Sequence, residues 1–104
     1  MTLLLGGCAG AYHTPSDGRL QTRINNAYKA RDACLERNAT ADASMAATAT
    51  SLEQTVAAAC LSETDQLIDL MNRDGDPRVA AAIRRDSEFR ARGFILKARG
   101  EGST

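Results

Sequence analysis

The sequence predicts an all-α protein that consists of an antiparallel helical hairpin and a third helix. Apolar residues recur at spacings of three, four and seven from Gly18 onward, which is the pattern of helices with one buried face. No segment shows the period of two that is typical of a strand. The 104 residues suit one small domain, and its hydrophobic residues include many alanines and no tryptophan. We therefore expect a thin core.

The segment Leu5-Gly6-Gly7-Cys8 resembles the lipobox of bacterial lipoproteins. In that family the motif is a leucine, a small residue, and a glycine or alanine before the cysteine that receives a diacylglyceryl group. Signal peptidase II then cuts in front of the cysteine, and the small residues let the enzyme approach the backbone closely. The resemblance implies that Cys8 is the site of lipid attachment.

The resemblance also divides the N-terminal region into two parts. Residues 1–7 would be the remnant of a signal peptide, and residues 8–17 a disordered, lipid-anchored tether, whose glycine, proline and serine residues suit a flexible segment. A signal peptide has about 15–30 residues and a basic start, whereas seven residues, none of them basic, precede Cys8. We therefore expect the rest of the signal to be encoded upstream of Met1. The alternative is a short cytoplasmic N-terminus in which the motif has no role.

The same resemblance implies a location and a set of partners. Because no aspartate follows Cys8, the protein would be an outer-membrane lipoprotein that faces the periplasm. Its partners would be the membrane, through the lipid, and another envelope protein or an anionic envelope polymer. The alternative location is the cytoplasm. No stretch of the chain approaches the roughly 20 apolar residues of a transmembrane helix.

The three cysteines fit this interpretation. If Cys8 carries lipid, Cys34 and Cys60 remain as a pair, and an exported protein would hold them as a disulfide. The fold then becomes a disulfide-stapled antiparallel hairpin with a third helix. The alternative is three reduced thiols in the cytosol, two of them buried as small apolar groups.

The first helix is expected over about residues 18–45, with Ser16 or Asp17 as its N-cap. Its end is ambiguous, because residues 38–50 are rich in alanine and threonine, and a helix that stops at Asn38 is an alternative. The disulfide favours the longer helix. Two cysteines in a hairpin lie level only when they are equally far from the turn, and the midpoint of Cys34 and Cys60 is residue 47.

The second helix is expected over about residues 51–72. Thr50 is followed three residues later by Glu53, and Ser51 by Gln54, so both pairs match the capping-box pattern at a helix start. The helix should end near Asn72.

The third helix is expected over about residues 77–99. Gly75 suits a left-handed helix end, Asp76 an N-cap, and Pro77 the first helical position. Gly93 weakens this helix and could fray or kink it. The sequence leaves open whether the helix folds back on the hairpin or extends away from it. Residues 100–104 are expected to be a disordered tail.

Charge is distributed unevenly along the chain. Residues 1–76 have a net charge of −4, and residues 77–104 a net charge of +4. Arg84, Arg85 and Arg92 share the face opposite the apolar stripe of the third helix and could contact an anionic partner. The simpler interpretation is a solvated, charged helix. Nucleic acid is an unlikely partner, because the chain as a whole is neutral.

No arrangement of residues indicates catalysis, a cofactor or a metal site. The single histidine, His13, falls in the expected tether, far in sequence from any helical serine. Asn72, Asp74 and Asp76 have the spacing of a calcium loop, but Pro77 replaces its glycine and Ile83 its glutamate. We therefore expect a small envelope lipoprotein with a structural or accessory role and no enzymatic activity. The alternative is a cytoplasmic interaction or nucleic-acid-binding protein that uses the basic third helix.

Overall fold

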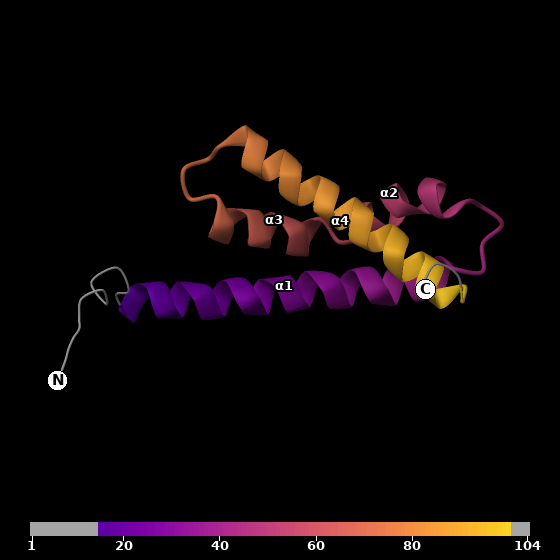
Figure 1. Cartoon of the computed structure of the whole chain (residues 1–104), viewed down its shortest axis with the longest axis horizontal. Helices are drawn as coiled ribbons and strands as arrows, with labels where there is room; N and C mark the ends of the chain where they lie inside the picture. The colour runs from indigo at the N-terminus through magenta and orange to yellow at the C-terminus, as the bar shows by residue number, and fades with distance from the viewer. Residues whose placement is uncertain (1–14, 101–104) are drawn as a thin grey trace.

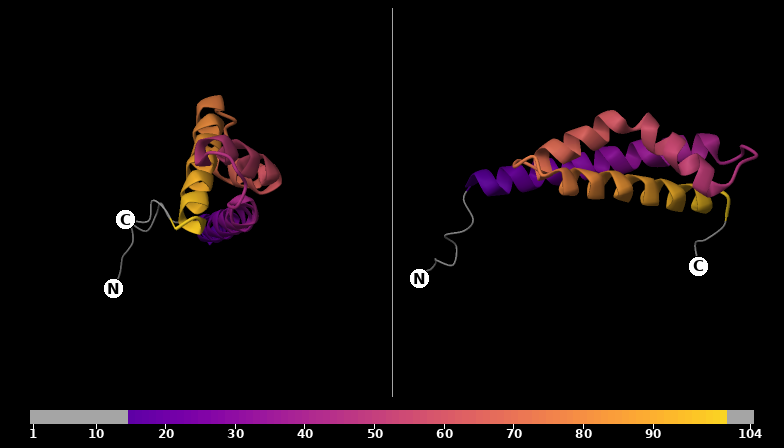
Figure 2. Two further views of the ribbon diagram at one scale, coloured as in Figure 1. Left: turned by 90° about the vertical axis from the view of Figure 1, so that its right-hand side faces the viewer. Right: turned by 90° about the horizontal axis from the view of Figure 1, so that it is seen from above.

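The computed structural model describes residues 15–100 and is all-α, as predicted. Its four helices are α1 (Pro15–Asp42), α2 (Ala49–Ala59), α3 (Leu61–Met71) and α4 (Pro77–Ala98). α1 runs along the whole bundle, and α2 and α3 return along it as a broken second arm (Figure 1). α4 then runs back across both arms, so that the bundle has three arms when it is seen end-on (Figure 2).

The predicted boundaries of the first helix are corrected at both ends. α1 begins at Pro15, so residues 15–17 of the predicted tether are helical. At the other end α1 stops at Asp42 and not near residue 45. The guanidinium of Arg99 binds the carbonyl oxygens of the next segment, at 2.8 Å from Ala43, 3.0 Å from Met45 and 2.7 Å from Ala47. These carbonyls are therefore turned toward α4 instead of continuing the helix. The predicted signal remnant, residues 8–14 of the tether and residues 101–104 of the tail lie outside the described residues.

The second arm consists of two helices, and the prediction of one helix over residues 51–72 is wrong. The chain leaves helical geometry at Cys60, whose amide bonds to the Ala57 carbonyl three residues back. Both the amide and the hydroxyl of Thr64 bind the Cys60 carbonyl, at 3.0 and 2.9 Å. The start is also earlier than predicted: the Thr48 hydroxyl, and not Thr50 or Ser51, caps α2 by accepting from the Ser51 amide at 3.0 Å.

α4 begins as predicted. Gly75 has a left-handed φ of 72°, and the Asp76 carboxylate accepts from the Arg78 amide at 2.8 Å. This hydrogen bond, together with the Arg78 side chain, lowers the pKa of Asp76 below its usual value. α4 continues through Gly93 to Ala98 without interruption. α4 folds back onto the hairpin and does not extend away from it, whereas the sequence left both arrangements open.

The core has two apolar parts with a polar layer between them. The first part surrounds the disulfide and includes Leu35, Val56 and Ile95. The second surrounds Leu67 and Ile83, nearer the turn between α3 and α4. On each arm one buried polar residue separates the two parts, and these three residues form what we call the polar layer: Arg31 on α1, Thr64 on α3 and Ser87 on α4.

The disulfide should supply a large share of the stability of this thin core. Closing a loop of this length stabilises the fold by about 3.5 kcal/mol in the chain-entropy model. We expect reduction with dithiothreitol to lower the free energy of unfolding by about 3–4 kcal/mol in urea titrations followed by circular dichroism. The Cys34→Ala/Cys60→Ala variant should have the free energy of unfolding of the reduced protein, and dithiothreitol should not change it. Cys8→Ser should behave like the parent chain. Equal urea midpoints for the oxidised and reduced protein would contradict this assignment.

Candidate functional site

The structure joins two of the three cysteines named above. Cys34 and Cys60 form a disulfide with their Cα atoms 5.9 Å apart. Both are buried, and the Asn38 amide nitrogen lies 3.5 and 3.6 Å from the two sulfurs. While the protein is folded, a buried bridge of this kind is shielded from external thiols, so dithiothreitol reaches it when the chain unfolds. The predicted lipidation site, Cys8, lies outside the described residues.

Glu63 is the one further metal-ligating side chain close to this bridge in the described part of the chain. Its carboxylate and the two sulfurs lie within 4.8 Å of one another. Cysteine binds metals as a thiolate, and sulfurs that are joined to each other carry no thiolate. With the bridge closed, the group therefore provides one carboxylate and no metal site.

Of the three arginines predicted to contact an anionic partner, two form ion pairs with other helices and one does not. Arg84 pairs with Asp65 of α3 at 3.5 Å, and Arg92 pairs with Glu53 of α2 at 3.2 Å. The Glu53 oxygen is not aligned for a hydrogen bond, so the Arg92 pair acts through charge. Arg85 is exposed and has no ionic partner within residues 15–100. Arg84 and Arg92 are therefore held by carboxylates at the surface of the bundle, and the contact of the three with an anionic partner stays a prediction.

The most constrained polar group is Arg31 of the polar layer, which the sequence analysis missed. Its guanidinium has no exposed surface and lies 3.0 Å from both Asp32 and Asp86. It donates to the Ser87 hydroxyl at 3.3 Å, and that hydroxyl is in turn 3.3 Å from the Thr64 hydroxyl. The guanidinium also lies over the Tyr28 ring, 5.2 Å from its centroid. The sequence did contain a signal for this buried group: Arg31 is a basic residue inside the apolar stripe of α1, between Ala27 and Cys34.

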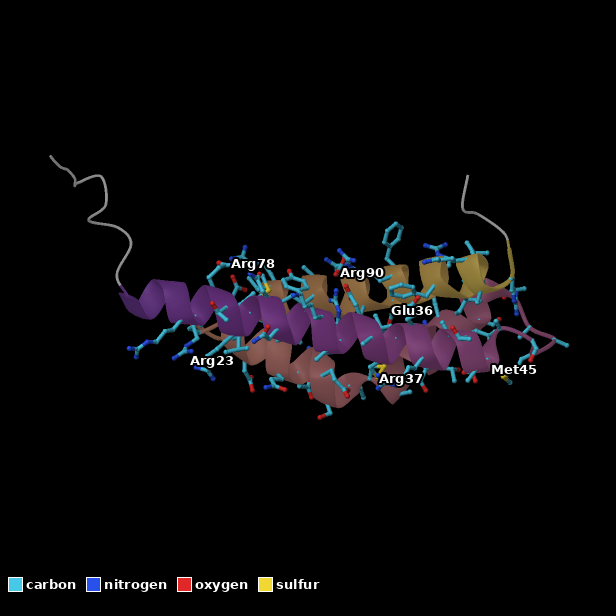
Figure 3. All side chains as sticks on the ribbon, turned by 90° about the horizontal axis from the view of Figure 1, so that it is seen from below. Arg23, Glu36, Arg37, Met45, Arg78 and Arg90 are labelled. Atoms are coloured by element: carbon cyan, nitrogen blue, oxygen red, sulfur yellow. A yellow bond between two sulfur atoms is a disulfide. The ribbon has the colours of Figure 1, made fainter. Side chains whose placement is uncertain are left out.

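A second arginine completes a neutral cluster around the same aspartates. Arg90 lies 3.0 Å from Asp86 and 3.5 Å from Asp32, at the edge of α4 (Figure 3). Burial lowers the pKa of Arg90, but the hydrogen bond and the charge of Asp86, aided by Asp32, raise it more, so the pKa exceeds its ordinary value. A shallow groove of about 520 Å³ passes over this cluster between α1 and α4. Because each guanidinium is matched by a carboxylate, the groove offers no unpaired cation to an anionic ligand.

The outer side of α4 carries an exposed aromatic ring. Phe89 is 66% exposed, and the Arg92 guanidinium lies 5.8 Å from its ring centroid. The helix surface next to Phe89 is hollowed at Gly93, in a shallow groove of about 440 Å³. In the sequence, the signal for this exposed ring was that Phe89 does not fall on the apolar stripe of α4.

The described residues contain no catalytic combination of nucleophile and base. The buried hydroxyls of Thr64 and Ser87 face each other and Arg31, and none of the described residues is a histidine. Asp65 and Asp69, one helical turn apart on α3, are exposed. This part of the chain therefore offers surfaces for contact and a buried layer that supports the fold.

Comparison with known proteins gives no relative from which a role can be transferred. No family model, curated protein or solved structure matches the chain. Among the helices that the structure describes, none has both the length and the apolar character to cross a membrane.

The buried and exposed arginines of the aspartate cluster should differ in their contribution to stability. We expect Arg31→Ala to lower the free energy of unfolding by about 3 kcal/mol, because it removes a fully buried side chain and breaks a buried ion pair. Arg90→Ala, which loses ion pairs to the same two carboxylates at the surface, should cost less than about 1 kcal/mol. Urea unfolding of both variants measures the difference, and equal costs would show that the polar layer has no special role.

Proposed function

We propose that the protein is a small lipoprotein of the bacterial cell envelope, with a structural or accessory interaction role and no catalytic activity. The observation that carries the proposal is the buried disulfide between Cys34 and Cys60. It accounts for two of the three cysteines, and disulfides of this kind persist in oxidising compartments. Cys8 is then the one cysteine left, and it stands in the motif that resembles a lipobox.

In this proposal the helical body lies close to the bilayer. Pro15, where α1 begins, follows Cys8 by seven residues, which span at most about 25 Å when extended. The lipid at Cys8 would hold the protein on the outer membrane, facing the periplasm. Another envelope protein or an anionic envelope polymer would be its partner there.

The alternative function is that of a cytoplasmic interaction or nucleic-acid-binding protein. The observation that favours it is the charge of α4, which has six basic and two acidic residues. Arg84, Arg90 and Arg92 are, however, paired with carboxylates of the bundle. Nucleic-acid binding that weakens steeply with salt would support this alternative.

Metabolic labelling tests the proposed lipid attachment. The gene would be expressed in bacteria together with the codons upstream of Met1, and the cells would be fed an alkyne-bearing fatty acid. We expect label on the parent chain and none on Cys8→Ser. The Cys34→Ala/Cys60→Ala variant is the matched control, because it changes cysteines and should keep the label. The proposal fails if the parent chain stays unlabelled, or if Cys8→Ser is labelled as strongly as the parent.

A further inference from the structure

The outer side of α4 has the composition of a surface that contacts something other than this chain. Phe89 is exposed, Leu96 is half-buried near it, and the groove at Gly93 lies between them. Residues at spacings of three, four and seven share one side of a helix. The members of this surface, which we call the Phe89 face, are Arg85, Phe89, Arg92, Gly93, Leu96 and Lys97.

The Phe89 face is cationic, and its charge is largely available. Arg85 and Lys97 are exposed and have no ionic partner among residues 15–100. The two acidic residues of α4 border this face, one on each side. Asp86 is held by Arg31 and Arg90 beside α1, and Glu88 lines a small cavity on the side of α2 and α3. The unpaired charge of the face is therefore that of Arg85 and Lys97, because Arg92 is paired with Glu53.

Gly93 is a second, independent observation at the same place. Glycine destabilises the interior of a helix relative to alanine. A Cβ atom at Gly93 would meet nothing within 4 Å, and α4 is regular there, so the packing of the bundle does not require glycine. The missing side chain leaves the helix surface open between Phe89 and Lys97, in the groove of about 440 Å³, where a molecule that lies against α4 could approach the backbone.

We propose that the Phe89 face binds the surface of an anionic phospholipid bilayer. Phe89 and Leu96 would lie at the boundary between headgroups and acyl chains, and the basic residues would contact lipid phosphates, which is the arrangement of interfacial helices. A bilayer fits better than nucleic acid, because the apolar part of the face includes an aliphatic side chain as well as an aromatic ring.

This inference rests on the proposed lipid at Cys8, which would hold the body at the same bilayer. The N-terminal end of α1 and the start of α4 lie toward the same end of the bundle (Figure 1). The Phe89 face lies farther along the bundle, in the second half of α4, which runs beside the second half of α1. The face would therefore reach the lipid with the long axis of the bundle lying along the bilayer surface. A single lipid chain gives marginal membrane binding, and a second, electrostatic contact makes it stable.

Vesicle binding of the unlipidated full chain tests the Phe89 face alone. The protein with Cys8→Ser would be mixed with vesicles of phosphatidylcholine, or of phosphatidylcholine and phosphatidylglycerol in equal amounts, and the bound fraction measured by flotation. We expect binding to the anionic vesicles that weakens as salt is raised, and little binding to the neutral ones.

Matched variants assign the binding to this surface. Arg85→Gln/Lys97→Gln should bind on the order of 30-fold more weakly, since each basic residue near an anionic membrane contributes about 1 kcal/mol and about 1.4 kcal/mol is tenfold. Lys29→Gln/Arg37→Gln removes two exposed charges from α1 and should bind like the parent. Phe89→Ala should lose about tenfold, whereas Met45→Ala, at a similarly exposed apolar residue, should lose little.

The results separate this inference from the lipid attachment itself. Equal binding to both vesicle types, or equal losses in the α1 and α4 charge variants, would overturn the Phe89 face as a membrane contact even if Cys8 is labelled in cells. Tighter binding to single-stranded or duplex oligonucleotides, with the same loss in Arg85→Gln/Lys97→Gln, would also overturn it and favour nucleic acid. Failure of Cys8 labelling with intact vesicle binding would overturn the lipoprotein proposal instead.

Discussion

The Cys34–Cys60 disulfide joins α1 to the second arm of the hairpin, and the first apolar part of the core is packed around it. Cys60 is the point where α2 and α3 separate, and its carbonyl is bound by Thr64 of the polar layer. Through Ser87, this layer connects to the buried guanidinium of Arg31. Buried polar groups are costly unless they are all paired, so the register in which the three arms can pack is restricted to one that satisfies them.

The distribution of charge among the three arms matches the way in which they pack. α2 and α3 contain four acidic residues and no basic ones, whereas α4 is strongly basic. Where α4 meets the acidic arm, Arg84 and Arg92 form ion pairs, and where it meets α1, Asp86 is held between Arg31 and Arg90. The outer side of α4 therefore retains uncompensated positive charge beside an exposed phenyl ring. Within residues 15–100, a chain that is neutral as a whole thus places exposed positive charge on the outer side of α4, which is the surface we propose as a contact.

Local signals allowed the helical class and the Gly75–Asp76–Pro77 boundary to be predicted from sequence. The pairing of Cys34 with Cys60 was predicted from the count of three cysteines, with Cys8 set aside as the lipid site. The break at Cys60 could not be predicted, because no glycine or proline marks it and its geometry depends on contacts with Cys34 and Thr64. The segment that follows the early end of α1 is bound by Arg99, which is more than 50 residues away in the chain. The ion pair of Arg84 could not be predicted for the same reason: spacing grouped Arg84 with Arg85, but only the tertiary structure shows that Asp65 binds Arg84.

The proposed envelope location depends on the disulfide being present where the protein works, because a closed bridge indicates an oxidising compartment and leaves Cys8 as the single remaining cysteine. The most direct test is to quench the cells that make the protein in acid, alkylate free thiols, and analyse the peptides that contain Cys34 and Cys60 by mass spectrometry without reduction. The account predicts that these two peptides are joined to each other and carry no alkyl group. Two separate, alkylated peptides would contradict it.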